Sequence, residues 1–215
     1  MTRDADFRQV ADLQPDADLQ PFFSTQYRAL ADSLVALSKE DWDTPSMCEG
    51  WGIREVIAHL TMPARYDEET FIAELKARQF DFSKLSNEIA LRDGQFSTEQ
   101  LLADLRSEKL HRWVPPGGSY RDSLNHVVIH SLDAIVPLGF QLSGTNEVFC
   151  VVLDHMTKGG VYERFGTQIT GRRLEATDLH WSWGQGGMLR GTASDLILVL
   201  AGRRLAGDRF DGLPL

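Results

Sequence analysis

Two histidines four residues apart are the strongest candidates for chemistry in this chain. His126 and His130 lie in a segment with helical periodicity, so their side chains project from one face on adjacent turns. Such a pair offers a metal ion two imidazole ligands from one rigid element. A third ligand must come from another segment, and His59, at the edge of the apolar stripe of an earlier predicted helix, is the best candidate. Three imidazoles would suit a borderline divalent ion and leave coordination positions open, as in catalytic zinc sites.

Two carboxylates accompany the histidine pair. Asp122 and Asp133 share its helix face, about one turn away on either side, and we expect them to accept hydrogen bonds from ring N–H groups. The apolar residues between positions 124 and 135 gather on the opposite side of the same helix. The stripe of four polar residues would therefore equally suit a solvated helix face, and spacing alone does not separate the two interpretations.

Composition narrows the class of protein. The chain has 215 residues, is 42% hydrophobic and carries a formal charge of -9, so we expect a globular protein that does not bind nucleic acid. Its two cysteines, Cys48 and Cys150, lie far apart and fit a reducing compartment. No signal peptide and no membrane-spanning apolar run is evident, so we expect a cytoplasmic protein without a membrane partner.

Hydrophobic periodicity and helix breakers divide the chain into elements. Helices are expected at about 19–37, from 52 to about 75 with a break at Pro63, and at about 97–113, 119–136, 146–158 and 193–204. Residues 38–42 are expected to form a turn, and residues 79–94 are mixed and compatible with one short helix. Glycines and short β-prone runs between 161 and 191 predict a small sheet of two or three strands, with Arg172 and Arg173 on a solvated strand edge.

These elements predict a mainly α fold built around four long helices. We expect a loose lead-in at residues 1–18, a helical bundle at residues 19–160 and a small α+β C-terminal module at residues 161–215.

The run CEGWGIREVIAHL, residues 48–60, resembles the first metal motif of the DinB-like superfamily, and specifically of its mycothiol-dependent maleylpyruvate isomerase branch. The run from His126 to Asp133 is similar to the second landmark of that branch, which usually has a carboxylate at the position of His126. Three histidines match the wider DinB-like pattern. The similarity continues through residues 174–178, Trp181, Trp183, 191–196 and the pair Gly202-Arg203, so it spans about residues 20–212.

The resemblance implies a DinB-like four-helix bundle with a short C-terminal module, and a divalent metal on His59, His126 and His130. Zinc is the favoured ion and nickel the alternative, although imidazoles also suit copper and iron(II). It also implies mycothiol or a related low-molecular-weight thiol as cosubstrate. Metal coordination would deprotonate that thiol, and the thiolate would either isomerise a small electrophile or be transferred to it.

Other functions stay open on sequence alone. A metal- or ligand-binding stress-response module without turnover, or a three-histidine metal hydrolase, would use the same residues. In a thiol-dependent enzyme, Arg203 would clamp a substrate carboxylate; the alternative is a solvated residue at the end of a helix. Cys48 is expected to pack as a small apolar residue rather than act as a nucleophile. The sequence does not specify the oligomeric state, a homodimer being one option.

Overall fold

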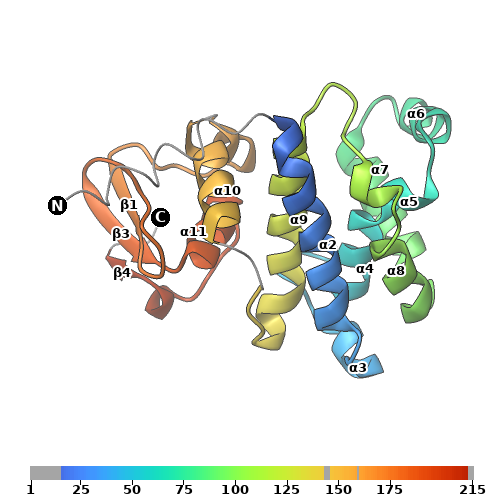
Figure 1. The fold of residues 1–215 in the computed structure, drawn as a ribbon, viewed down its shortest axis with the longest axis horizontal. Helices are drawn as coiled ribbons and strands as arrows, with labels where there is room; N and C mark the ends of the chain where they lie inside the picture. The colour runs from blue at the N-terminus through green and yellow to red at the C-terminus, as the bar shows by residue number, and fades with distance from the viewer. Residues whose placement is uncertain (1–15, 143–145, 159, 213–215) are drawn as a thin grey trace.

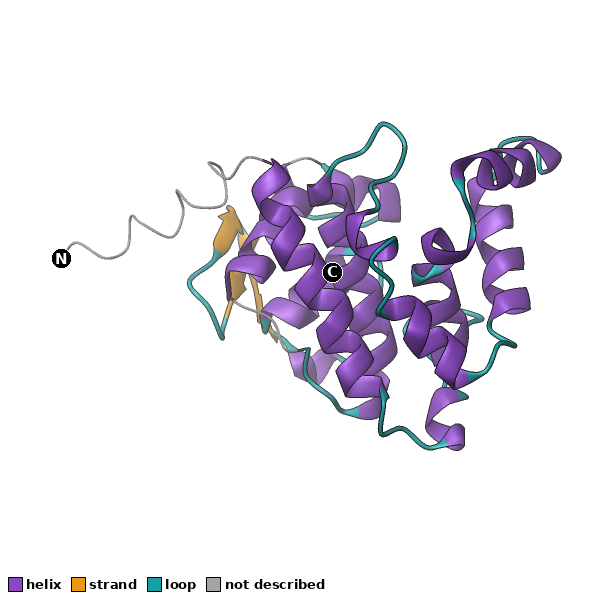
Figure 2. Ribbon diagram, turned by 45° about the vertical axis from the view of Figure 1, so that its right-hand side comes forward, coloured by secondary structure: helices purple, strands orange, loops and turns teal. Residues whose placement is uncertain are grey.

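The protein folds as a mainly α structure with a small sheet at one end (Figure 1, Figure 2). The structure is a computed structural model that describes residues 16–142, 146–158 and 160–212. Residues 1–15, most of the predicted lead-in, lie outside the described residues. Its last part is not loose, because Asp16–Leu19 form a short 3-10 helix and the Leu19 side chain is buried.

Four helices form the bundle: α2 (Gln20–Leu34), α4 (Ile53–Leu60), α8 (Thr98–Leu105) and α9 (Tyr120–Ile135). Each of them packs against two of the others, which closes a ring around a shared core. The apolar positions at helical spacing point into that core. The following are at most 1% exposed: Phe23, Tyr27, Leu30 and Leu34 of α2, Ile53, Val56, Ile57 and Leu60 of α4, and Leu124, Val127, Val128 and Leu132 of α9.

The starts of α4 and α9 are defined by hydrogen bonds near each first turn. The Gly52 N–H donates to the Glu55 carboxylate over 2.9 Å, which begins α4. Ser119 begins α9 with a reciprocal capping box, because its hydroxyl accepts from the Asp122 N–H and its own N–H donates to the Asp122 carboxylate. Proline at position 137 ends α9, since it has no N–H to donate.

Four more α-helices of the described N-terminal two thirds surround the bundle helices: α3 (Lys39–Trp42), α5 (Met62–Arg65), α6 (Glu68–Ala77) and α7 (Phe82–Asp93). The turn expected at residues 38–42 was wrong, because Ser38 and Asp41 form a capping box and Trp42 anchors the helix in the core. Residues 79–94 contain a full helix, α7, which packs against α4.

The helix expected to reach about residue 113 ends at Leu105. The chain then turns, and a 3-10 helix at Leu110–Arg112 brings Leu110 and His111 against α2. The His111 ring stacks on Tyr27 with 5.7 Å between centroids. Tertiary packing therefore overrides the local helical pattern in this segment.

The C-terminal part adds α10 (Asn146–Lys158), α11 (Ala193–Leu200) and four strands: β1 (Arg172–Ala176), β2 (Ser182–Gly184), β3 (Gly187–Gly191) and β4 (Asp211–Gly212). The strand order is β2-β1-β3-β4, with β1 parallel to β3 and the other two pairs antiparallel. Three strands lie between residues 161 and 191, as expected, and β4, which lies beyond that range, adds a fourth. Arg172 and Arg173 do not lie on an edge, because β1 has partners on both sides.

The helices α10 and α11 connect the sheet to the bundle (Figure 1). α11 contacts β1, β3 and α10, while α10 contacts α9, and one continuous apolar core includes residues from all of these parts. The division into a bundle at 19–160 and a module at 161–215 stays a prediction. Within the described residues, no helix is both long and apolar enough to cross a membrane.

Candidate metal centre

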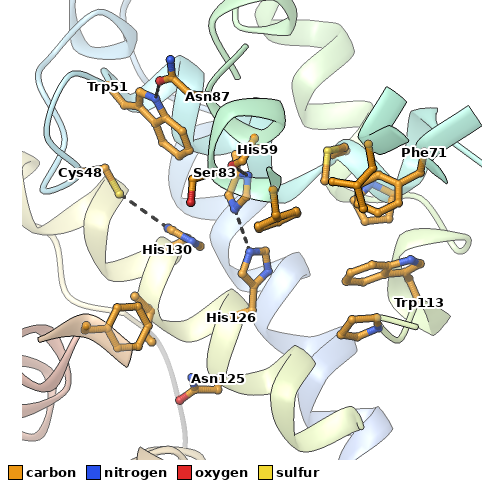
Figure 3. Close-up of a pocket in the computed structure, with 18 of the residues that line it drawn as sticks. Cys48, Trp51, His59, Phe71, Ser83, Asn87, Trp113, Asn125, His126 and His130 are labelled. Atoms are coloured by element: carbon orange, nitrogen blue, oxygen red, sulfur yellow. Dashed lines mark hydrogen bonds between the residues drawn. The ribbon is translucent and has the colours of Figure 1, made fainter. Parts of the chain in front are cut away.

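Three imidazoles from two helices meet at one point. His59 lies in the last turn of α4, and His126 and His130 lie on consecutive turns of α9 (Figure 3). The His59 and His126 Nε2 atoms are 2.9 Å apart, and one ligand nitrogen from each of the three histidines lies within 4.8 Å of the others. The ring centroids are 4.8–5.0 Å apart in edge-to-face arrangements. The predicted trio is therefore brought together, and the histidine pair does not lie on a solvated helix face.

His59 is held by contacts from two neighbouring segments. Its Nδ1 lies 3.0 Å from the Ser86 hydroxyl of α7, and its ring lies 5.2 Å from the Trp51 ring. Trp51 is held in turn by a hydrogen bond from its Nε1–H to Asn87 Oδ1. Gly50, in the turn just before Trp51, has a φ of +80°, which glycine adopts without strain. These contacts direct Nε2 of His59 toward α9.

His59 and His126 are neutral near pH 7. Burial, and then the neighbouring His130 and His126, hold the pKa of His59 well below its ordinary value. Burial and His130 lower the pKa of His126 to about 3. Neutral imidazole is the form that binds metal, so the unliganded protein already presents these two rings in the required state.

His130 is oriented by a buried carboxylate. Its Nδ1 lies 2.9 Å from Asp133 Oδ2, whose side chain is fully excluded from solvent. Burial alone would raise the pKa of Asp133, but hydrogen bonds from Arg203 and His130 outweigh burial and hold that pKa well below its usual range. An ionised carboxylate only accepts, so His130 donates its Nδ1–H to Asp133. This is the carboxylate–histidine arrangement common in metal sites.

Arg203 and Cys48 complete the surroundings of Asp133. The Arg203 Nε and Nη2 donate to the two carboxylate oxygens over 2.8 and 2.7 Å, a bidentate pair. The Cys48 thiol donates to Asp133 Oδ2 over 3.0 Å and lies 3.2 Å from Arg203 Nη2. Burial and the Asp133 charge raise the pKa of the Cys48 thiol, so it is protonated. The apolar packing expected of Cys48 was therefore incomplete, because its thiol joins a polar cluster.

Gly202 is the residue that lets Arg203 reach Asp133. It adopts a φ of +77° just after α11, and the Arg203 N–H donates back to Leu198 O, which closes the helix. A Cβ at residue 202 would lie 2.9 Å from the Phe165 carbonyl oxygen. The expected helix to about residue 204 therefore ends at Leu200, and the chain turns Arg203 toward the bundle.

The contacts of Asp122 differ from those expected. Its carboxylate caps α9 through Ser119 and lies 3.1 Å from His155 Nε2 of α10. It occupies the third position of its helix, where a carboxylate reaches back to the first N–H groups. The prediction that Asp122 would support the histidine pair therefore does not match its contacts, and Asp133 alone of the two carboxylates touches the pair.

The chemistry of the donor set fits one borderline divalent ion. Nitrogens around a tetrahedral zinc lie about 3.3 Å apart when each bond is about 2.0–2.1 Å long. The 2.9 Å between the His59 and His126 Nε2 atoms is within a few tenths of an ångström of that spacing. A second group, Cys48, His130 and Asp133, also has ligand spacing, but the Arg203 guanidinium already donates to two of its members and would repel a cation.

A cavity of about 840 Å³ opens beside the three histidines. Its wall is formed by the bundle and also by the C-terminal part, through Phe165 and Arg203. Figure 3 shows Trp51 and Cys48 on one side of the histidines and Phe71 and Trp113 on the other. The volume lies in the upper range of small-molecule sites, so a ligand of substantial size could lie next to an ion held by the histidines.

Sequence reasoning missed two residues of the site, Ser86 and Asn87, and gave Cys48 a different role. Ser86 and Asn87 lie on α7, whose sequence pattern was mixed and whose contacts with α4 are not local. Cys48 did carry a signal, since it opens the motif that leads to His59. Its hydrogen bond to a residue 85 positions away could not be read from that motif.

Comparisons with known proteins point to one family. Residues 23–134 match the family described as the mycothiol maleylpyruvate isomerase N-terminal domain. Two crystal structures of the mycothiol-dependent maleylpyruvate isomerase, one of them a histidine-to-alanine mutant, align with TM-scores of 0.59 and 0.61. Each is 14% identical to this chain and covers 94% of both chains, so the likeness concerns the fold. No curated protein matches the chain significantly in sequence.

Proposed function

Because the chain belongs to the family of the mycothiol maleylpyruvate isomerase N-terminal domain, we propose that it is a metal- and thiol-dependent enzyme. In this proposal His59, His126 and His130 hold one divalent ion, with zinc favoured and nickel the alternative. Mycothiol or a related low-molecular-weight thiol is the cosubstrate. The second substrate is a small electrophile, which is either isomerised or receives the thiol.

One observation carries the proposal: three imidazoles converge at the wall of a large cavity that both parts of the chain enclose. A structural metal site is usually closed by four protein ligands, whereas a catalytic site keeps a position open toward a cavity. The three nitrogens and the adjacent 840 Å³ space favour the second kind of site.

The ion would deprotonate a thiol and present it as a thiolate at neutral pH. The surrounding residues prepare for this. The three ligands are imidazoles rather than carboxylates, so they contribute no negative charge that would weaken the binding of an anionic thiolate. Ser86 and Asp133 hold the rings of His59 and His130 by their Nδ1 atoms.

Two outcomes follow from a thiolate in this position. It can add to one carbon of an activated alkene, forming a C–S bond while the π bond breaks. Rotation about the remaining single bond and expulsion of the thiolate then regenerate the alkene in its other isomer. Alternatively the thiolate displaces a leaving group and the new C–S bond stays. Neither outcome needs a nucleophile from the protein, in keeping with the protonated state of Cys48.

We assign Arg203 to holding Asp133 rather than to clamping a substrate carboxylate. A clamp would use the same guanidinium fork that Asp133 occupies. Arg203 is thus a positioning residue, which acts on His130 through the carboxylate between them.

Elemental analysis of purified protein tests the metal ligands. Wild-type protein should contain stoichiometric metal, whereas the His59→Ala and His126→Ala variants should lose it with their helicity unchanged by circular dichroism. His180→Ala is the matched control, because His180 is exposed and lies outside the cluster. Retention of metal in either cluster variant would mean that the ligands are assigned wrongly.

The reaction is tested separately. Metal-loaded protein is incubated with mycothiol and a panel of electrophiles, and thiol adducts and isomerised products are followed by mass spectrometry and chromatography. Turnover should depend on both the metal and the thiol. Metal retention without any turnover would favour a binding module instead, and hydrolysis without thiol would favour a metal hydrolase.

A further inference from the structure

The walls of the cavity carry little positive charge that could bind an anionic substrate. Among the described residues that line it, Arg203 is the only lysine or arginine, and Glu49 adds a negative charge at an exposed position. The Arg203 fork is already paired with a carboxylate that is fully excluded from solvent. A substrate carboxylate that recruited Arg203 would leave Asp133 buried without its counter-charge, which is strongly unfavourable.

Aromatic and aliphatic side chains form most of the remaining wall. Trp51, Phe71, Phe82 and Trp113 contribute rings, and Phe71 and Phe82 lie 6.3 Å apart between centroids. Phe82 is 49% exposed although it is large and apolar. Rings that line a cavity and remain accessible offer apolar contact area to a flat ligand.

Apart from Glu49, Arg203 and the histidines, this wall carries uncharged polar side chains. They include the amides of Asn87 and Asn125 and the hydroxyls of Ser83 and Ser86. The Asn125 side chain is 7% exposed and contributes an amide to this wall. Amides and hydroxyls give a substrate carboxylate no counter-charge.

From these three features we infer that the electrophilic substrate is an uncharged molecule with an aromatic or similarly flat apolar body, not a dicarboxylate. The inference rests on the proposed function, since it names the substrate class of the same site. A metal ion on the histidines would bind one anionic group, and in the proposed reaction that group is the thiolate of the cosubstrate. A dianionic electrophile would then face Glu49 and a neutral, largely apolar wall.

The test compares two ligands that differ in charge but share one aromatic body: 4-chloro-3-nitrobenzoate and its methyl ester. Binding to the full chain is measured by isothermal titration calorimetry in the metal-free protein, where no ion can attract the carboxylate. We expect the ester to bind at least about tenfold more tightly, since the anion gains no free counter-charge.

Two phenylalanine variants locate the binding. Phe82→Ala should weaken ester binding by about tenfold, because it removes an apolar surface of the cavity. Phe80→Ala is the matched control, since Phe80 lies two residues earlier, is 67% exposed and does not line the cavity. Its ester binding should equal that of the wild type.

Three results overturn the inference: the anion binds the metal-free protein as tightly as the ester, neither ligand binds, or the two phenylalanine variants behave alike. The metal-free measurement separates this inference from the proposed function. A preference for the ester in a protein that holds no metal would remove only the proposed function. Metal- and thiol-dependent turnover with a preference for anions would remove only the inference about the substrate.

Discussion

The pairing of Arg203 with Asp133 joins the C-terminal part of the chain to the candidate metal centre, and its removal has a calculable effect. The two groups make two hydrogen bonds of 2.7 and 2.8 Å, and the Asp133 side chain is 0% exposed while that of Arg203 is 17% exposed. Replacing Arg203 with methionine keeps much of the side-chain volume but leaves a carboxylate buried without its charge partner.

Removal of one partner from a buried ion pair destabilises a protein by about 3–5 kcal/mol. For a chain of this length each kcal/mol lowers the melting temperature by about 2–4 °C, so Arg203→Met should melt about 6–20 °C below the wild type. Replacing both partners removes the orphaned charge. The double variant with Asp133→Asn should therefore be more stable than Arg203→Met alone, even though it lacks more hydrogen bonds.

Urea unfolding followed by tryptophan fluorescence, with thermal unfolding by circular dichroism, measures these differences. Arg106→Met is the control: its partner is Asp32, the two side chains are 43% and 74% exposed, and its loss should change stability by less than about 1 kcal/mol. If Arg203→Met were no less stable than this control, or if the double variant were the least stable protein, the buried pair would not hold the two parts together as argued.

Two further predictions concern groups near and far from the site. Cys48→Ala should keep the wild-type metal content in elemental analysis, because the three histidines are the proposed ligands. Loss of metal would instead favour the second group of possible ligands, Cys48, His130 and Asp133. His111 is 1% exposed and burial lowers its pKa, so the unfolded chain takes up a proton near pH 6.5 while the folded chain does not. Stability should be highest above that pH and fall as the pH drops toward the lower folded value. His111→Gln should reduce the slope by up to about 1.4 kcal/mol per pH unit in urea titrations at pH 7.5, 6.5 and 5.5, and an unchanged slope would contradict this.

Much of the helical framework could be predicted from the sequence because helix formation depends on neighbours three and four residues apart. The segment expected at 119–136 is α9 at Tyr120–Ile135, and the segment expected at 146–158 is α10 with the same bounds. The spacing of His126 and His130 on one face follows from the same local geometry. The motif that ends at His59 also indicated the family, which the match over residues 23–134 shows.

Where packing competes with local pattern, prediction from sequence was less accurate. Residues 106–113 have helical character, yet the chain turns there so that His111 can reach Tyr27. Arg172 and Arg173 were expected on a solvated strand edge, but β1 pairs with both β2 and β3 and so lies inside the sheet. In both cases the deciding contacts join residues that are far apart in the chain.

Asp122 and Asp133 show most clearly what the sequence determines and what it leaves to the tertiary structure. Both lie one turn from the histidine pair, and their spacing gives them equal claims to support it. Asp122 is drawn to the helix start by Ser119 and to α10 by His155, whereas Asp133 meets His130, Cys48 and Arg203. Helical geometry decides which side chains share a face, because it depends on the local backbone. Which of them is buried and paired depends on partners that arrive from 70 and 85 residues away, and those partners are brought together only when the core assembles.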